Sequence, residues 1–170
     1  MIRDFLDEFA KYRKAGEGAL AQVPDAGLNA VPAADANSIA MIVRHISGNL
    51  RSRFTDFLTT DGEKPWRARD EEFVERTYAR ADIDEMWTAG WRVVEAEVGA
   101  LSDADLSRTV TIRGEAMTVH LALCRATAHM AYHVGQIVLL ARQFGDREWK
   151  SLSIPKGKSE EFNRKLNRGS

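Results

Sequence analysis

Residues 118–144 are predicted to form one long helix, and this segment constrains the fold more than any other. Most of its side chains are Leu, Val, Ala, Ile or Met, and they cover most of the helix surface. A helix with this pattern is buried on several sides. Gly145 directly follows and is a common residue at the end of a helix. The chain therefore needs other helices that pack around residues 118–144.

Three other segments carry apolar residues at helical spacing, over roughly residues 2–22, 38–60 and 82–101. Ser38 is a good N-cap for the second segment, as is Asn37 before it. Asp82, with Glu85 three residues later, predicts a capping box at the start of the third. Together the four segments predict an all-α four-helix bundle that forms a single domain over residues 1–170.

The segments between these helices differ in character. Residues 61–80 are polar and irregular, which makes a long connection for a bundle, and long connections are often functional. Within them we interpret the charge run of residues 69–73 as a solvated loop. Residues 109–112 alternate in polarity and predict a short strand, which Gly114 would allow to turn into a hairpin. From about residue 150 to residue 170 an extended tail is predicted.

The composition excludes several classes of function. Hydrophobic residues make up 44% of the chain and charged residues 29%, which suits a folded domain with a wet surface. Lys and Arg number 24 against 25 Asp and Glu, so no nucleic-acid partner is expected. There is no apolar run of about 18 residues to predict a membrane span, and the acidic, amphipathic N-terminus is unlike a signal peptide. A lone cysteine, Cys124, favours a cytoplasmic protein.

The helix predicted over residues 118–144 carries one polar stripe. On a helical wheel at about 100° per residue, five polar side chains share one arc, and they are Arg125, His129, Tyr132, His133 and Gln136. Such a stripe on a buried helix is costly unless a facing polar helix, water or a metal ion satisfies it. His129 and His133 lie one turn apart on one face, so both imidazoles can reach one ion.

A third metal ligand is available on the second predicted helix. His45 lies on the flank of that helix's apolar stripe and can turn inward at the seam with residues 118–144. His120 and Cys124 project away from His129, so neither is predicted to be a ligand. The alternative for His45 is a core histidine bonded to a backbone carbonyl. The alternative for the remaining polar stripe is a buried hydrogen-bond network or a subunit interface.

Two stretches resemble the DinB-like family. One contains Ser38-Ile39-Ala40, His45 and Gly48-Asn49-Leu50-Arg51-Ser52-Arg53, and the other is His129-Met-Ala-Tyr132-His133-Val-Gly135-Gln136-Ile137. Residues 61–64, 69–73 and 153–159 are similar to one uncharacterised branch of the family. The resemblance covers nearly the whole chain. It implies an up-down-down-up bundle, often a homodimer, with a three-histidine site that opens to a cavity and has ligands at His45, His129 and His133.

The resemblance also implies a chemistry. Characterised relatives include metal-dependent transferases that join a low-molecular-weight thiol, such as bacillithiol or mycothiol, to an electrophile. One divalent ion is therefore expected, Zn²⁺ or Ni²⁺ first among the metals that suit three imidazoles, together with a small-molecule substrate. Three protein ligands leave a coordination position open, which is typical of a catalytic site.

Five further residues are expected to support the ligands or bind substrate, but none is assigned as catalytic. Asn49 and Gln136 are expected to orient ligands or substrate, Arg53 or Arg125 to hold a substrate carboxylate, and Tyr132 to lie beside them. Two other functions stay open: a metal-dependent hydrolase that uses bound water, and a non-enzymatic metal-binding stress-response bundle. A homodimer is also expected, because one bundle needs only one buried face per helix.

Overall fold

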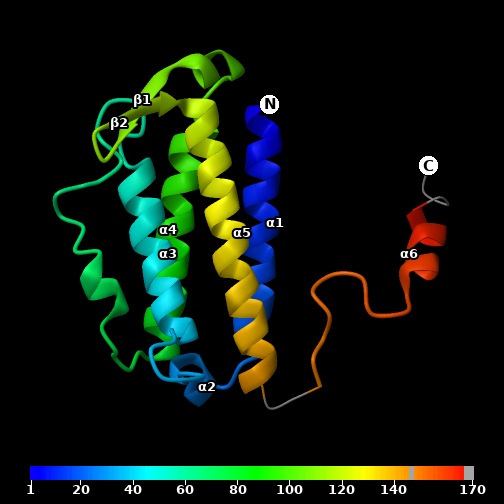
Figure 1. Cartoon of the computed structure of the whole chain (residues 1–170). Coiled ribbons are helices and arrows are strands. Elements are labelled where there is room, and N and C mark those ends of the chain that lie inside the picture. Colours follow the sequence, from blue (N-terminus) through cyan, green and yellow to red (C-terminus); the bar gives the residue numbers. More distant parts are fainter. Residues whose placement is uncertain (146–147, 167–170) are drawn as a thin grey trace.

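Four long helices lie side by side in the computed structural model, which describes residues 1–145 and 148–166 (Figure 1). These helices are α1 (Ile2–Leu20), α3 (Ile39–Phe54), α4 (Arg80–Gly99) and α5 (Val119–Phe144). In Figure 1, α1 and α5 run downward while α3 and α4 run upward. The predicted all-α bundle with up-down-down-up order is therefore confirmed.

Shorter elements connect the four helices. They are α2 (Asp25–Asn29), the 3₁₀ turns η1 (Asp70–Phe73) and η2 (Asp103–Ser107), the strands β1 (Thr109–Ile112) and β2 (Glu115–Thr118), and α6 (Ser159–Leu166). The predicted strand over residues 109–112 is confirmed, and it pairs antiparallel with β2 from Thr109↔Thr118 to Ile112↔Glu115. Arg113 and Gly114 both have positive φ, as a two-residue hairpin turn requires.

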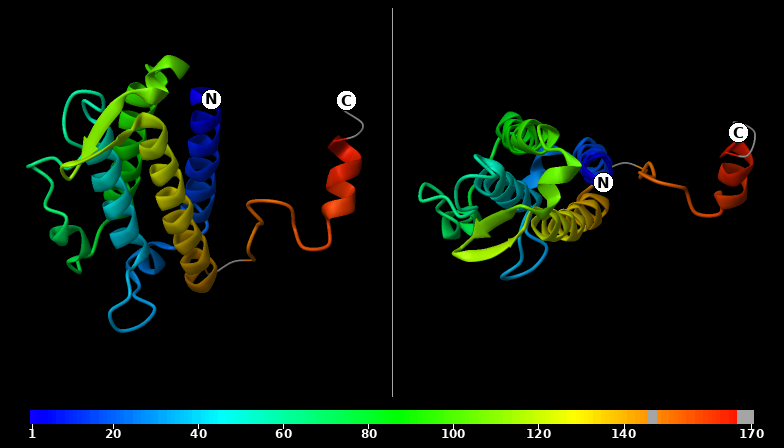
Figure 2. Two further views of the ribbon diagram at one scale, coloured as in Figure 1. Left: turned by 45° about the horizontal axis from the view of Figure 1, so that its top comes forward. Right: turned by 90° about the horizontal axis from the view of Figure 1, so that it is seen from above.

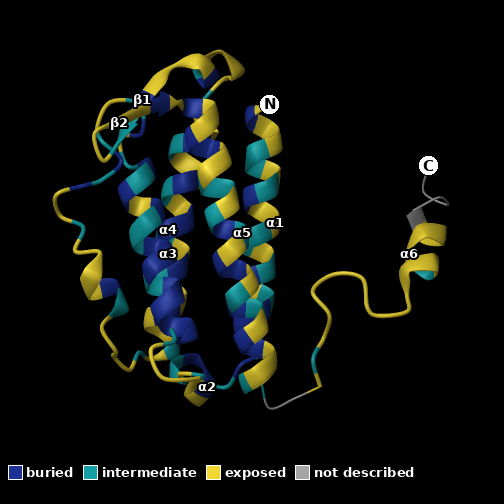
Figure 3. Ribbon diagram, in the orientation of Figure 1, coloured by how far each residue is buried: buried dark blue, intermediate teal, exposed yellow. Residues whose placement is uncertain are grey.

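The core lies between the four helices, whose inner faces are buried along their whole length (Figure 3). Its largest fully buried side chains come from α2, α3, α4 and α5. Among them are Leu28, Ile39, Ile46, Phe54, Trp91, Leu123, Met130 and Ile137. The view from above places the helices at the corners of a square, with the β1–β2 hairpin across one end (Figure 2). No helix in residues 1–145 or 148–166 is long and apolar enough to cross a membrane.

Two expectations about element boundaries need correction. The second predicted helix ends at Phe54, so that Phe57 reaches the core from a turn. The third begins at Arg80 and not at Asp82. There the Asp82 carboxylate accepts the backbone N–H of Ala79 at 3.1 Å, so Asp82 sits inside the first turn.

The C-terminal tail was expected to be extended, and this is wrong in part. Residues 148–158 are irregular, but α6 forms over Ser159–Leu166, while residues 167–170 lie outside the described part of the chain. Acidic residues in its first turn and basic residues in its last turn suit the helix dipole, and Glu161 bonds Lys165 at 3.0 Å. The helix stands apart from the bundle in both views (Figures 1 and 2).

The connection from α3 to α4 is long because the two helices are parallel neighbours, so the chain must return along the bundle. Residues 55–79 make this crossover and are tied to the bundle at both ends. Near its start, Ser52 Oγ donates to the Gly62 carbonyl at 2.8 Å and accepts from Lys64 N at 3.1 Å. Near its end, the Asn29 amide exchanges two hydrogen bonds with the Tyr78 backbone. The crossover is therefore a fixed wall along α3.

Candidate metal centre

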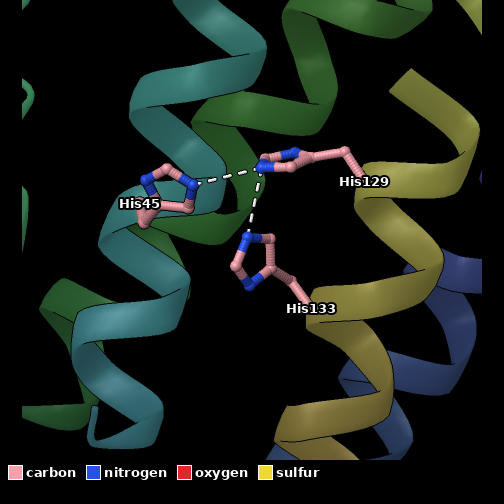
Figure 4. Close-up of side chains that lie close together, drawn as sticks. All are labelled: His45, His129 and His133. Carbon is pink, nitrogen blue, oxygen red and sulfur yellow. Dashed lines mark hydrogen bonds between the residues drawn. The ribbon is translucent and has the colours of Figure 1, made fainter. Parts of the chain in front are cut away.

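Three histidine rings from two helices point at one another inside the bundle (Figure 4). His45 projects from the middle of α3, and His129 and His133 project from successive turns of α5. The Nε2 of His129 lies 3.2 Å from Nε2 of His45 and 3.1 Å from Nε2 of His133. All three potential ligand atoms lie within 4.8 Å of one another. The structure thus brings together the three residues that the sequence singled out.

The rings of His45 and His133 are held by hydrogen bonds on their outer nitrogens. Nδ1 of His45 contacts Oε2 of Glu72 at 2.8 Å, and Nδ1 of His133 contacts Oε1 of Gln136 at 2.8 Å. Because both partners are acceptors, each Nδ1 carries the proton. Each Nε2 then presents a lone pair toward His129.

These lone pairs face one another in a way that suits a bound cation. A neutral His129 can donate from Nε2 to one neighbour only, which leaves the other lone pair without a donor. Its own Nδ1 is buried and finds no hydrogen-bond partner in the described part of the chain. Two nitrogens bound tetrahedrally to one ion at about 2.0–2.1 Å stand roughly 3.3–3.4 Å apart, close to the spacing seen here. The three histidines therefore fit a divalent metal.

The protonation states also suit metal binding. Burial, followed by the repulsion of His133 and His45, lowers the pKa of His129 to about 3. Burial likewise lowers the pKa of His133. Burial alone would raise the pKa of Glu72, but hydrogen bonds from His45 and Arg67 outweigh it and the pKa falls. At neutral pH His129 and His133 are therefore neutral and Glu72 is ionised, which suits metal binding.

Glu72 was missed by sequence reasoning, which treated residues 69–73 as a solvated loop. The interpretation is wrong for this residue: Glu72 is 5% exposed, and Arg67 holds its carboxylate through two hydrogen bonds of 2.8 and 2.9 Å. Gly48 makes the approach possible, because a Cβ there would stand 2.1 Å from Oε1 of Glu72. A glycine inside α3, three residues after His45, was the signal that another group comes close.

A cavity of about 440 Å³ opens onto the histidine cluster. The expected residues Asn49, Arg53 and Arg125 line it, together with the three histidines. Gln136 acts differently, through its bond to His133. Tyr132 does not line the cavity; its side chain is 63% exposed and meets the His133 ring edge-on, with centroids 4.9 Å apart.

The two groups that were expected to lie away from the cluster are found elsewhere on α5. His120 packs edge-to-face against Phe5 of α1, with ring centroids 5.7 Å apart. Cys124 is an exposed free thiol whose Sγ lies 3.9 Å from Nε2 of His120. Neither residue belongs to the histidine cluster.

Fold and site together define a four-helix bundle that carries an inward-facing, three-histidine site between its second and fourth long helices. The sequence matches the family described as "Protein of unknown function (DUF1572)" over residues 1–158, and the chain belongs to that family, which is DinB-like. No curated protein matches the sequence.

A solved structure shares the fold. The crystal structure of a DinB-like protein from Bacillus cereus ATCC 10987 is similar to this chain with a TM-score of 0.61 and 19% sequence identity. The match covers 82% of this chain and 89% of that one. At this identity the likeness supports the shared bundle architecture.

Proposed function

We propose that the protein binds one divalent metal ion through His45, His129 and His133 and transfers a low-molecular-weight thiol to an electrophilic substrate. One observation carries the proposal: three imidazole nitrogens converge at the end of a cavity. Among the described residues no carboxylate or thiol completes the group, so a bound ion would keep a position open toward the cavity. Structural sites usually have four protein ligands.

His45, His129 and His133 would hold a divalent ion, which would lower the pKa of a bound thiol and so supply a thiolate nucleophile at neutral pH. The reaction then needs no protein base. The thiol proton leaves to solvent, the sulfur forms a bond to the electrophilic carbon, and the leaving group departs with its bonding pair. The cytoplasmic setting favoured by the lone cysteine would keep such a thiol reduced.

The chain's own residues prepare the site. Glu72 and Gln136 hold the rings of His45 and His133 so that Nε2 of each faces the cavity end. Phe54, Phe57 and Phe73 line the cavity and limit the water around the reacting groups. Asn49, one turn beyond His45 on the same helix, is placed to orient a bound substrate. Zn²⁺ and Ni²⁺ both suit this donor set.

The proposal is tested with protein purified without a nickel column and loaded with Zn²⁺ or Ni²⁺. Bacillithiol, mycothiol and glutathione are each supplied with a bimane electrophile, and the thiol adduct is measured. We expect adduct formation above the background rate with at least one thiol, and its loss on chelation and in His133→Ala. If no thiol reacts while an ester or amide is cleaved in a metal-dependent way, the protein is a hydrolase instead. If neither reaction occurs, the non-enzymatic alternative replaces both.

A further inference from the structure

The walls of the cavity carry an unusual amount of positive charge. Five of its lining residues are arginines, contributed by α3, the crossover, the hairpin and α5, and they are Arg53, Arg67, Arg69, Arg113 and Arg125. Glu115 is the one carboxylate among the lining residues that the structure describes. The three histidines at the far end add no negative charge. A divalent ion bound there would raise the positive charge further.

Four carboxylates pair with these five arginines, so one carboxylate must be shared. Arg125 pairs with Glu115, Arg69 with Asp70 at 3.6 Å and Arg67 with Glu72. Glu63 is shared: its Oε2 accepts from Arg53 at 2.9 Å and from Arg113 at 3.0 Å, and lies 3.9 Å from Nη1 of Arg67. Glu72 forms an ion pair with Arg67 and is also hydrogen-bonded to His45. One carboxylate thus stands between three guanidinium groups.

Two of the arginines differ in how firmly they are held. The Arg53 side chain is 15% exposed and also donates to the Gly62 carbonyl; burial lowers its pKa despite Glu63, so its charge is poorly compensated. The Arg125 side chain is 53% exposed and pairs loosely with Glu115 at 3.4 Å. A buried guanidinium and a half-exposed one on facing helices suit an incoming anion, because Arg binds carboxylates through paired hydrogen bonds.

The rest of the lining is apolar, from Phe54, Phe57, Phe73, Ile112, Ala122 and Ala126. The charged and metal-binding ends are also separated along the bundle. Arg53 follows His45 by eight residues on α3 and Arg125 precedes His129 by four on α5, so at 1.5 Å per residue they stand roughly 12 and 6 Å further along the helix axis. The cavity therefore has the histidine cluster in one part, and Arg53 and Arg125 stand further along the bundle beside apolar side chains.

We propose that this cavity binds a small apolar molecule that carries a carboxylate roughly 6–12 Å from the group that meets the histidine cluster. Arg53 and Arg125 hold the carboxylate, and the aromatic side chains hold the body of the molecule. The inference rests on the proposed function for what happens at the metal end, but its carboxylate end rests on the arginines alone. The carboxylate belongs either to the thiol or to the electrophile. The first arm of the experiment tests a thiol that carries a carboxylate, and the second tests a carboxylate on a molecule without a thiol.

The first arm uses the full-length protein loaded with Co²⁺, because a cobalt–thiolate bond gives a charge-transfer absorption band. The probes are 6-mercaptohexanoate and the neutral 6-mercaptohexanol, which differ only at the end remote from sulfur. We expect the acid to bind at least about tenfold more tightly than the alcohol. The preference should disappear in Arg53→Gln and in Arg125→Gln, and persist in Arg92→Gln, which changes an exposed arginine of α4 outside the cavity.

The second arm uses metal-free protein and calorimetry with 6-phenylhexanoate and its amide, which contain no thiol. A preference for the acid that depends on Arg53 and Arg125 supports the carboxylate subsite without any metal. If acid and neutral probe bind alike in both arms, the inference is wrong even if the thiolate band appears. If the acid is preferred in the second arm but neither thiol produces a band, the inference stands and the thiol-transfer proposal fails. Arg125→Gln guards against misfolding of Arg53→Gln, since the Arg125 side chain is 53% exposed and its ion pair is with an exposed carboxylate.

Discussion

The carboxylate of Glu72 sets the orientation of one metal-binding ring. It accepts from Nδ1 of His45 at 2.8 Å and is itself fixed by Arg67, whose side chain is 2% exposed. A carboxylate behind a histidine ligand fixes the ring tautomer and makes the ligand nitrogen more basic. The hydrogen bonds that link Arg67 to Glu72 and Glu72 to His45 are therefore expected to determine how tightly the site binds a metal ion.

The three histidines are expected to be the metal ligands. His45→Ala, His129→Ala and His133→Ala should each lower the bound metal sharply, because two imidazoles hold a divalent ion much less tightly than three. His120→Ala should leave metal content unchanged, since His120 packs against Phe5. Elemental analysis of the purified variants measures the effect. Full occupancy in His129→Ala would rule out the ligand assignment.

Glu72→Gln is expected to weaken metal binding by about tenfold to a hundredfold, which is the usual effect of removing such a supporting carboxylate. The amide keeps the size of the side chain but removes the negative charge facing His45. Glu71→Gln is the matched control, because Glu71 is exposed and pairs with Arg76. Competition with a chromogenic chelator measures both dissociation constants. Equal affinities in the two variants would argue against the role of Glu72.

The stability of the metal-free protein is expected to depend on pH through His129. Its pKa is about 3 when folded, whereas an unfolded histidine titrates near its ordinary value of 6.5. Between these values the unfolded chain binds the extra proton, so the free energy of unfolding falls as the pH drops from about 6.5 toward 3. His129→Gln should show a shallower loss. Urea midpoints measured for both proteins from pH 7 to pH 4 provide the test, and parallel curves would contradict it.

At the scale of the elements, the crossover of residues 55–79 completes the site. It contributes Arg67 and Glu72 behind His45, and Arg69 and Phe73 to the cavity. Asp61 ties it to the hairpin by accepting the backbone N–H groups of Arg113 and Gly114 at 2.9 Å each. Asp61 also accepts the backbone N–H of Glu63. These three hydrogen bonds lower the pKa of Asp61, and the one from Glu63 contributes most. The hairpin and crossover together form the outer wall of the cavity.

Gly48→Ala is expected to weaken metal binding without unfolding α3. The new Cβ would meet Oε1 of Glu72 at 2.1 Å and push the carboxylate from His45, although alanine itself favours a helix. Gly135→Ala is the control, because nothing lies within 4 Å of a Cβ there. That variant should gain about 0.5–1 kcal/mol of stability and keep its metal affinity. Denaturant unfolding and metal titration distinguish the two; unchanged affinity in Gly48→Ala would be inconsistent with the close approach.

The long helices and the His129–His133 pair are predictable from the sequence because both depend on local periodicity, whereas His45 joins the pair only through the packing of α3 against α5. Apolar spacing marks α1, α3, α4 and α5, and helical geometry alone places His129 beside His133. The burial of Glu72 is different: it depends on Arg67 and on the gap at Gly48, and no local pattern shows that these residues meet. Helix α6 is short and polar, with a pattern set by charge pairs such as Glu161–Lys165, so apolar spacing did not reveal it.

At the scale of the whole molecule, α5 keeps one apolar face that the bundle does not cover. Helix α1 packs against one side of α5. On another side Leu121, Tyr132 and Leu139 are 48%, 63% and 68% exposed. The expected homodimer stays a prediction, and this face is the surface that we propose for it.

Light scattering at micromolar concentration is expected to give the mass of a dimer. Leu139→Glu should give a monomer, because it places a charge on the apolar surface proposed for the contact between the two copies. Val74→Glu changes an equally apolar, 44% exposed side chain on the crossover and should leave the dimer intact. A monomer mass for the unmodified protein would exclude the dimer.

The packing of α3 against α5 determines when the histidine cluster can form during protein synthesis. His45 and His129 are 84 residues apart, and the ribosome adds roughly 5–20 residues each second, so about 4–17 s separate them. In that interval a nascent chain exposes one of the three imidazoles, and α1 has no α5 to dock against. Under the proposed function, an ion would therefore be taken up only after the last long helix has left the ribosome, and its supply in the cell would act on chains that already carry all three histidines.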